Sequence, residues 1–167
     1  MDVAIVSIAE EYIAGYCRCL DDVARERRHL GIVKGLSEDR SRAFVLHNIE
    51  QRNPHLVVVD QGRVVGWCDI ERRRLEGFTH CGHLGMGLLP DYRRKGLGRQ
   101  LVETALRLAQ EAGIERVELE VYASNTAAVA LYERFGFERE GVKKRARFLD
   151  GVYDDLLCMA RFLPREG

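Results

Sequence analysis

The sequence is poor in proline and in long apolar runs. Its three prolines stand apart, and no low-complexity segment or internal repeat divides the 167 residues. No apolar run approaches the roughly 18 residues of a membrane-spanning helix, and the first residues lack the basic and apolar segments of a secretory signal. We therefore expect one domain over residues 1–167, in a cytoplasmic protein without a membrane partner.

The sequence also lacks an excess of charge of either sign. Lysine and arginine together number 26, and so do aspartate and glutamate. A balanced chain does not have the overall positive charge that attracts nucleic acids, so no nucleic-acid partner is expected. Two basic runs, Arg72–Arg74 and Lys143–Arg147, are expected on solvated faces. Their alternative role is to attract cofactor phosphates or an acidic group of a substrate.

Cysteine is sparse and irregularly spaced. The five cysteines are Cys17, Cys19, Cys68, Cys81 and Cys158. The number is odd and only the first two are close, which fits neither a disulfide framework nor a zinc ligand set. We expect reduced thiols packed as small apolar side chains, and no metal site.

The apolar periodicity predicts an α/β chain in the order βααβββαβαββ, with a mainly antiparallel sheet and one crossover region. Ser37 and Asn125 are the expected N-caps of two helices. The expected strands are 3–8, 55–60, 63–71, 79–89, 117–122, 137–148 and 152–162, and the expected helices are 10–28, 37–51, 98–112 and 125–134. The strand over 79–89 holds three glycines, which indicates close approach of another backbone or a ligand.

The segment from Leu88 to Arg99 carries the most informative chemistry. Pro90 breaks a strand, and Gly96 and Gly98 open a long helix. Amide groups at a helix start are unpaired and the helix dipole is positive there, which suits a phosphate, and glycine lets the phosphate touch the backbone. The pattern is neither a P-loop nor the dinucleotide-binding fingerprint. It predicts a pyrophosphate site, with added positive charge from Arg93, Arg94, Lys95 and Arg99.

Two motifs resemble those of one known family. The pattern R-x-x-G-x-G from Arg93 to Gly98 resembles the acetyl-CoA signature of the GCN5-related N-acetyltransferase (GNAT) family. The stretch from Asn125 to Phe137 resembles the N-x-x-A-x-x-L-Y-x-x-x-G-F helix of the same family. The motifs follow in the family's order, separated by one helix and one strand. The resemblance implies a single-domain GNAT fold, whose sheet splays at a bulge in the strand before the pyrophosphate loop.

Within that family the sequence looks most similar to the phosphinothricin and L-amino-acid N-acetyltransferase branch. The similar segments are Leu84–Met86, Glu120–Asn125 and Asp150–Asp155. Ribosomal-protein N-terminal acetyltransferases share parts of this pattern. The resemblance implies an acetyl-CoA-dependent enzyme that acetylates a primary amine of a small molecule, an amino acid or an analogue, by direct attack in a ternary complex. The alternatives are a protein N-terminal acetyltransferase and a non-catalytic acyl-CoA-binding module. A homodimer is a further expectation from the family.

The resemblance also implies which residues hold acetyl-CoA. Leu88 and Leu89 would offer backbone groups to pantetheine and the thioester, and the amides from Arg94 to Arg99 would hold the pyrophosphate. Arg134 would reach the phosphates at the adenosine end. The full implied set is Leu88, Leu89, Arg93, Arg94, Lys95, Gly96, Leu97, Gly98, Arg99, Asn125, Ala128, Tyr132 and Arg134.

Acetyl transfer needs a proton donor for the thiolate and an acceptor for the amine proton. The resemblance makes Tyr132 the general acid. The strand position where some members of the family carry a basic glutamate is Gly82 here, so the base is supplied elsewhere or by water. His80 and His83 are the nearest candidates, because imidazole titrates in the useful range.

Other side chains remain open between a structural and a functional role. Asp69 and Glu71 are further candidates for the base, although we expect them as exposed carboxylates at a strand end. Tyr16, Phe44 and Trp67 are expected in the core, with a substrate pocket as the alternative.

Overall fold

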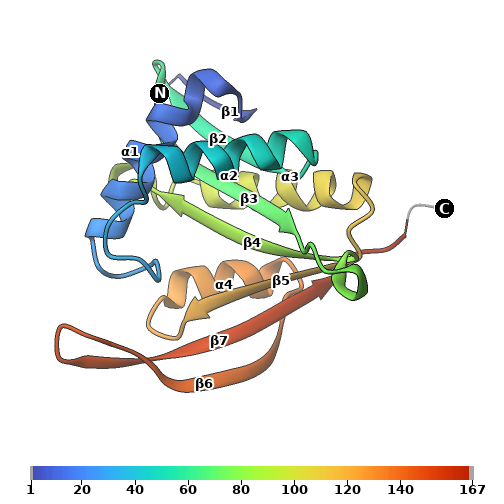
Figure 1. Ribbon diagram of the computed structural model, residues 1–167. Coiled ribbons are helices and arrows are strands. Elements are labelled where there is room, and N and C mark those ends of the chain that lie inside the picture. Colours follow the sequence, from blue (N-terminus) through green and yellow to red (C-terminus); the bar gives the residue numbers. More distant parts are fainter. Residues whose placement is uncertain (1, 166–167) are drawn as a thin grey trace.

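A computed structural model describes residues 2–165, which form a seven-stranded sheet with helices on both faces (Figure 1). The order of elements is the predicted βααβββαβαββ. The strands are β1 (Val3–Ser7), β2 (His55–Asp60), β3 (Arg63–Arg72), β4 (Cys81–Leu88), β5 (Arg116–Tyr122), β6 (Glu138–Leu149) and β7 (Val152–Phe162). The helices are α1 (Ile13–Arg25), α2 (Glu38–Glu50), α3 (Leu97–Glu111) and α4 (Thr126–Arg134), and short 3-10 turns η1 (Glu10–Tyr12), η2 (Glu76–Phe78) and η3 (Pro90–Tyr92) connect them.

The central strands β4 and β5 are parallel and pair over a short stretch only. The sheet order is β1-β2-β3-β4-β5-β7-β6, and the other neighbouring strands are antiparallel. The β4–β5 pairing ends at His83 and Glu118, after which the strands diverge toward their C-terminal ends (Figure 1). The predicted splay is therefore confirmed. The bulge expected in β4 is not found, because β4 keeps a single register against β3 from Gly82 to Leu88.

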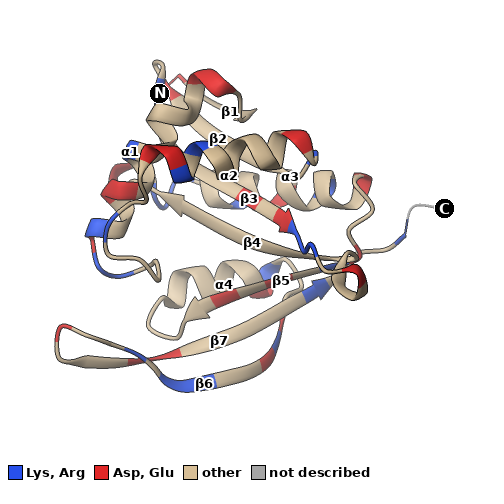
Figure 2. Cartoon of the chain, in the orientation of Figure 1, with Lys and Arg blue, Asp and Glu red and all other residues tan. Residues whose placement is uncertain are grey.

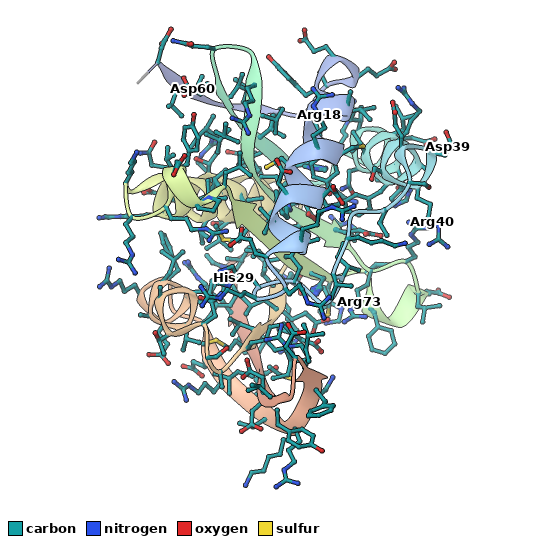
Figure 3. The ribbon with its side chains drawn as sticks, turned by 90° about the vertical axis from the view of Figure 1, so that its left-hand side faces the viewer. Arg18, His29, Asp39, Arg40, Asp60 and Arg73 are labelled. Carbon is teal, nitrogen blue, oxygen red and sulfur yellow. The ribbon has the colours of Figure 1, made fainter. Side chains whose placement is uncertain are left out.

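Two helices cover each face of the sheet. On one face, α1 places Tyr16 against His55 and Trp67, and α2 lies beside α1 (Figure 3). On the opposite face, α3 and α4 meet where Gly98 approaches Leu131. Apolar residues recur every three or four positions along α1 and α3, so each helix buries one stripe on the sheet. The two faces can therefore hold different ligands on either side of the splay.

The helix boundaries follow local capping chemistry. Ser37 Oγ accepts a hydrogen bond from the Arg40 amide at 3.3 Å, and Asn125 Oδ1 accepts one from the Ala128 amide at 3.3 Å, which confirms both predicted N-caps. The first helix is shorter than the predicted range 10–28. It begins after a 3-10 turn and ends at Arg25, because Arg27 adopts a left-handed backbone with φ 58°.

The glycines of β4 accommodate side chains from both layers. A Cβ atom at Gly82 would lie 2.6 Å from Ile70 Cγ2, and one at Gly87 would lie 2.4 Å from Trp67 Cη2. Gly85 differs, because a Cβ there would lie 3.5 Å from the nearest atom, Asp69 Oδ2. The predicted approach of a backbone or a ligand is not what Gly82 and Gly87 accommodate, because the close atoms belong to the side chains of Ile70 and Trp67; Gly85 leaves space beside a carboxyl group.

Candidate active site

The start of α3 is an open helix N-terminus next to the splay. Gly96 has φ 80°, a left-handed conformation that favours glycine, and no side chain caps the helix. The first helical hydrogen bond runs from the Gln100 amide to the Gly96 carbonyl. Within residues 2–165, the amides of Leu97, Gly98 and Arg99 have no acceptor. The structure therefore presents three outward amides at the place where the sequence predicts pyrophosphate binding.

Gly98 brings this helix start close to β4. A Cβ at position 98 would lie 3.4 Å from Leu131 Cδ2 and 3.6 Å from Met86 Cε. The start of α3 is thus adjacent both to α4 and to the gap-facing part of β4. A ligand with its phosphates on α3 would enter the splay directly.

The basic side chains near the helix start have different roles. Arg94 and Arg99 are exposed, and Lys95 lies over the Tyr92 ring at 5.8 Å. Arg93 points back into the fold: its Nε donates to the Leu88 carbonyl at 2.9 Å, and its two terminal nitrogens bind the Glu26 carboxylate at 2.9 and 2.6 Å. The Arg93 guanidinium therefore joins the end of β4 to the end of α1, and its charge is balanced.

Along β4 the backbone amides point alternately toward β3 and toward the gap between β4 and β5. Leu89 donates to the Val65 carbonyl at 2.9 Å, so the antiparallel ladder turns the amides of Met86 and Leu88 toward the gap. Both backbone groups of Leu89 are used, since its carbonyl accepts from Tyr92. The backbone donors available to a pantetheine chain are thus at Met86 and Leu88 rather than at Leu88 and Leu89. The two-residue period of the strand could have identified Met86 from the sequence.

Tyr132 lies on the α4 side of the sheet, beside the same part of β4. Its side chain is 6% exposed and packs edge to face on Phe137, with ring centroids 5.7 Å apart. Burial raises its pKa far above the usual range, and the nearby Cys68 acts in the same direction. Cys68 is the cross-strand partner of Met86. Tyr132 therefore keeps its proton and is positioned near the gap, as a general acid requires.

The implied cofactor residue Arg134 is exposed at the end of α4, and Ala128 is half-buried with its amide bonded to the Asn125 cap.

The two candidate histidines lie at the closed end of the splay. His80 precedes β4, and its carbonyl accepts hydrogen bonds from the amides of Glu115 and Arg116. His83 is the last β4 residue paired with β5, on the face that α1 and α2 cover. The side chain is exposed to the pocket, and partial loss of hydration there lowers the pKa of His83, with Arg73 acting in the same direction. Since His80 is about 26 Å along the strand from Leu88, His83 is the nearer of the two to the gap.

The carboxyl group of Asp69 is buried, which corrects the expectation of an exposed strand end. The residue is 7% exposed, and its neighbours His55 and Gly85 on the flanking strands leave it facing a pocket. Burial, and to a smaller extent the Glu71 charge, raise the pKa of Asp69 to about 8. Glu71 is half-buried and paired with Arg74 at 3.2 Å.

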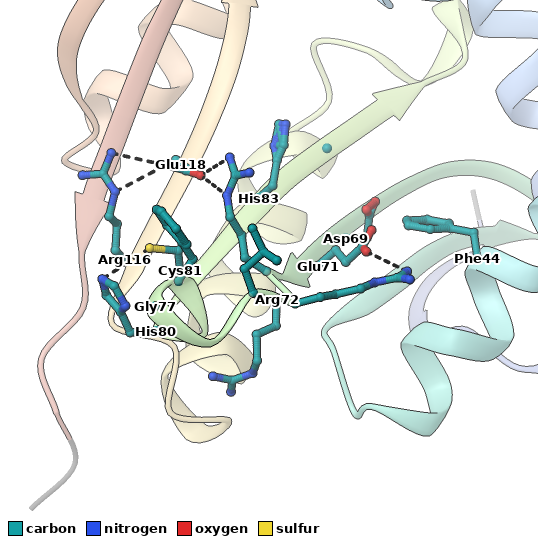
Figure 4. Close-up of a pocket in the computed structure, with 15 residues that line it drawn as sticks. Phe44, Asp69, Glu71, Arg72, Gly77, His80, Cys81, His83, Arg116 and Glu118 are labelled. Atoms are coloured by element: carbon teal, nitrogen blue, oxygen red, sulfur yellow. Dashed lines mark hydrogen bonds and ion pairs between the residues drawn. The ribbon is translucent and has the colours of Figure 1, made fainter.

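A pocket of about 930 Å³ opens on the face that α1 and α2 cover (Figure 4). Phe44 lines it, whereas Tyr16 and Trp67 are core residues at 4% and 3% exposure. The walls come from α2, β3, the loop after β3, β4 and β5. The lining residues are Phe44, Asp69, Glu71, Arg72, Arg73, Arg74, Leu75, Gly77, Phe78, His80, Cys81, His83, Gly85, Arg116 and Glu118.

The arginines of this pocket are all engaged within the fold. Arg72 donates to the carbonyls of Thr79 and Ala112. Arg73 and Arg116 both bind Glu118 (Figure 4). Arg74 binds Glu71, so Asp69 is the acidic side chain of the lining that has no arginine partner among the described residues.

The basic runs are continuous, and acidic groups of neighbouring segments lie beside them (Figure 2). In the second run Lys143 binds Glu120 at 3.0 Å, and Arg147 stacks on the Tyr122 ring at 3.8 Å while binding Asp154. Arg147 also donates to the Arg28 carbonyl, so the β6–β7 hairpin contacts the loop after α1. Arg147 is thus a structural residue and not part of a solvated face.

The described residues contain no cluster of three or more His, Cys, Asp or Glu side chains suited to a metal ion. Their five cysteines are free thiols. Among the helices described, none is both long and apolar enough to span a membrane.

The stability of the fold should depend on pH through Asp69 and His55. Asp69 holds a proton in the folded state that unfolding releases, so its stabilising effect is lost as the pH rises toward about 8. Burial lowers the pKa of His55 to about 4. As the pH rises from 4 to 6.5, His55 therefore increases the free energy of unfolding, and this increase offsets the decrease caused by Asp69. Between about pH 6.5 and 8, below the range in which the buried cysteine thiols titrate in the unfolded chain, Asp69 should lower the free energy of unfolding by at most about 1.4 kcal/mol per pH unit.

Urea unfolding between about pH 6.5 and 8 measures this fall directly. In the Asp69→Asn variant the free energy of unfolding should no longer fall with pH. This variant should be more stable than the wild type at the highest pH of the range. Asp91→Asn, which changes an exposed carboxyl, should keep the fall. An unchanged slope in Asp69→Asn would show that another group is responsible.

Comparison with known proteins identifies related N-acetyltransferase sequences. A 71-residue stretch is 39% identical to the [ribosomal protein bS18]-alanine N-acetyltransferase of Escherichia coli K12, covering 42% of this chain and 48% of that one. The match therefore spans about half the length of that relative. The L-amino acid N-acetyltransferase AaaT of the same organism is 28% identical over 64% of this chain and 66% of its own. An N-alpha-acetyltransferase of Saccharolobus solfataricus is 32% identical over 71% and 74%.

Solved structures share the fold over almost the whole chain. A GNAT-family acetyltransferase from Streptococcus pneumoniae superimposes with a TM-score of 0.90 at 25% identity, covering 98% of this chain and 100% of that one. A phosphinothricin acetyltransferase from Sinorhizobium meliloti, in complex with AcCoA, gives 0.90 at 19% identity, covering 98% and 89%. The family model described as the acetyltransferase (GNAT) family matches residues 20–137. Since that match covers most of a chain with the splayed sheet and the open α3 start, the protein belongs to the acetyltransferase (GNAT) family.

Proposed function

We propose that the protein transfers an acetyl group from acetyl-CoA to a primary amine, by direct attack in a ternary complex. The observation that carries this proposal is the splay itself. In the described part of the chain, an open helix start, the β4 amides of Met86 and Leu88 that face away from β3, and a buried tyrosine all lie around one gap. The Sinorhizobium meliloti relative was crystallised with AcCoA, which supports the same cosubstrate here.

The chain fits acetyl-CoA along the α3 side of the gap. The amides of Leu97, Gly98 and Arg99 would bind the pyrophosphate at the helix start. The amides of Met86 and Leu88 would pair with pantetheine and the thioester as with an added strand. A backbone donor aimed at the thioester oxygen stabilises the charge that develops there during attack.

Tyr132 would supply the proton that the departing thiolate needs. Its raised pKa keeps the hydroxyl protonated throughout the physiological range. Because Tyr132 is on the cofactor side of the sheet, it can reach the sulfur without obstructing the amine on the other side. The reaction joins nitrogen to the acetyl carbon and releases CoA as a thiol.

The pocket on the opposite face indicates the class of amine. Asp69 and Glu71 face it, and its arginines are held by internal partners. The Asp69 carboxyl, which has no partner among the described residues, suits an ammonium group, whereas a free α-carboxylate would have to displace the acceptors that the arginines already bind. The acceptor that the pocket supports best is thus a primary amine without a free carboxylate beside it, such as a polypeptide N-terminus. The amino acid expected from the sequence becomes the second candidate. We retain a cytoplasmic location and a homodimer as expectations.

A matched set of amines tests both the activity and the acceptor class. L-alanine, L-alaninamide and a tripeptide that begins with alanine differ in the group beside the amine. We expect alaninamide and the tripeptide to exceed alanine in kcat/KM by about tenfold or more, equivalent to about 1.4 kcal/mol, because only alanine carries the extra charge. Thiol release with and without acetyl-CoA measures the rates.

Faster acetylation of alanine than of the other two amines would favour the hypothesis that the acceptor is an amino acid. No acetylation of any primary amine, with acetyl-CoA still bound, would instead favour a non-catalytic acyl-CoA-binding module.

The role of Tyr132 predicts a selective loss in the Tyr132→Phe variant. Removing the hydroxyl should lower kcat by about 10²-fold, because the thiolate loses its proton donor. The thermal shift caused by acetyl-CoA should remain, since the ring still packs on Phe137. Tyr12→Phe, which removes a hydroxyl outside the site, serves as the matched control. Full activity of Tyr132→Phe at all pH values would remove Tyr132 as the acid.

A further inference from the structure

Asp69 is a buried carboxyl group without a partner. It makes no hydrogen bond or ion pair within residues 2–165, although it is 7% exposed. Burial of an unpaired polar group is costly, so such a group persists where it serves a function. Here the group faces a pocket on the amine side of the sheet (Figure 4).

The two flanking strands leave one side of Asp69 open. Ile70 donates to the Pro54 carbonyl, so Asp69 and His55 form a non-hydrogen-bonded pair, in which the side chains are close. On the other side Asp69 is paired with Gly85, which has no side chain. A Cβ at position 85 would lie 3.5 Å from Asp69 Oδ2 and 3.8 Å from Oδ1. The carboxylate therefore leans over the backbone of Gly85.

Gly85 is next to the residue whose amide faces the gap. Met86 follows it on β4, and the gap between β4 and β5 is already open at this level, since the pairing ends at His83. One strand spacing is about 4.8 Å. An amine that attacks an acyl group held at the Met86 amide would thus lie within reach of the Asp69 carboxylate, directly or through one water.

The groups packed around Asp69 contribute no positive charge. Tyr16 faces it from α1, His55 from β2, Glu71 from the same strand, and His83 follows on β4 beyond Gly85; α2 contributes the ring of Phe44 to the same wall. His55 Nδ1 faces the Asn48 amide nitrogen at 3.2 Å, so that nitrogen accepts and Nε2 carries the proton. Nε2 is buried and has no hydrogen-bond partner among the described residues. His55 is therefore neutral and leaves the Asp69 carboxylate available.

We propose that Asp69 is the group that takes the proton from the acceptor ammonium. This inference rests on the proposed acetyl transfer. The carboxylate removes one proton from the ammonium, and the neutral amine then forms the carbon–nitrogen bond with the acetyl group. The carbon–sulfur bond breaks, and the thiolate takes a proton from Tyr132. The second nitrogen proton restores the Tyr132 hydroxyl through solvent, and Asp69 releases its proton to solvent.

His83 is the rival for this role. It is exposed, and it lies where β4 and β5 are still paired, between Glu71 and Glu118 on the neighbouring strands. Asp69 is the cross-strand partner of Gly85, which lies beyond the last paired residue of β4 and β5, where the gap is open. The geometry thus favours Asp69 over His83.

The test is the pH dependence of kcat/KM with an acceptor amine that titrates well above pH 8. The acid limb of this profile then belongs to the free enzyme. In the wild type we expect a midpoint near the Asp69 pKa of about 8. Asp69→Asn should lose this limb, with kcat/KM lowered by about 10²-fold or more. Glu71→Gln should move the midpoint to lower pH, because the charge of Glu71 contributes to the raised pKa of Asp69.

Gly85→Ala provides a second variant that does not alter the carboxyl group. Its methyl would make ordinary contact with Asp69, so the fold should be kept, but it would stand between Asp69 and the pocket. We expect kcat/KM for the amine to fall about tenfold, a ratio that corresponds to a small change in fit. The thermal shift with acetyl-CoA should be unchanged in both variants.

Several outcomes would overturn the inference. They are an Asp69→Asn variant with wild-type rate and pH profile, a loss of acetyl-CoA binding together with activity, and a His83→Gln variant that alone removes the acid limb. If the wild type acetylates no amine, the proposed function fails before this test begins. If the wild type acetylates amines and only the Asp69 predictions fail, the proposed function stands.

Discussion

The divergence of β4 from β5 is the constraint on which the site depends. A parallel pair that continued past His83 and Glu118 would satisfy the amides of Met86 and Leu88 within the sheet. Because the strands separate, these donors remain available next to the open start of α3. Arg93 stabilises this arrangement by joining the Leu88 carbonyl to Glu26. The gap is thus maintained by contacts outside it.

The two faces of the sheet separate the two halves of the proposed reaction. The α3 and α4 side offers helix amides and a protonated tyrosine, which suit a phosphorylated thioester. The α1 and α2 side offers the Asp69 carboxyl, which suits an amine. Asp69 illustrates the cost of this arrangement, because a buried carboxyl with a raised pKa reduces stability at the pH where it becomes charged.

Local sequence signals predict the order of elements and the open start of α3. The caps at Ser37 and Asn125 and the glycines before α3 act over a few residues, so the sequence alone identifies them. The amine side depends on contacts between distant segments. Asp69 is buried by neighbours from α1, α2 and β2, and Arg93 finds Glu26 at the end of α1. No local pattern reports such contacts, which is why Asp69 was expected at an exposed strand end.

The central claim is that the splay accepts the pantetheine chain as an added strand on β4. Amide hydrogen exchange, measured residue by residue with and without acetyl-CoA, tests it most directly. The account predicts that acetyl-CoA slows exchange at Met86 and Leu88, together with Leu97, Gly98 and Arg99 at the start of α3. Leu89, whose amide is already bonded to Val65, should change little. Bound acetyl-CoA that leaves the Met86 and Leu88 amides exchanging as before would contradict the account.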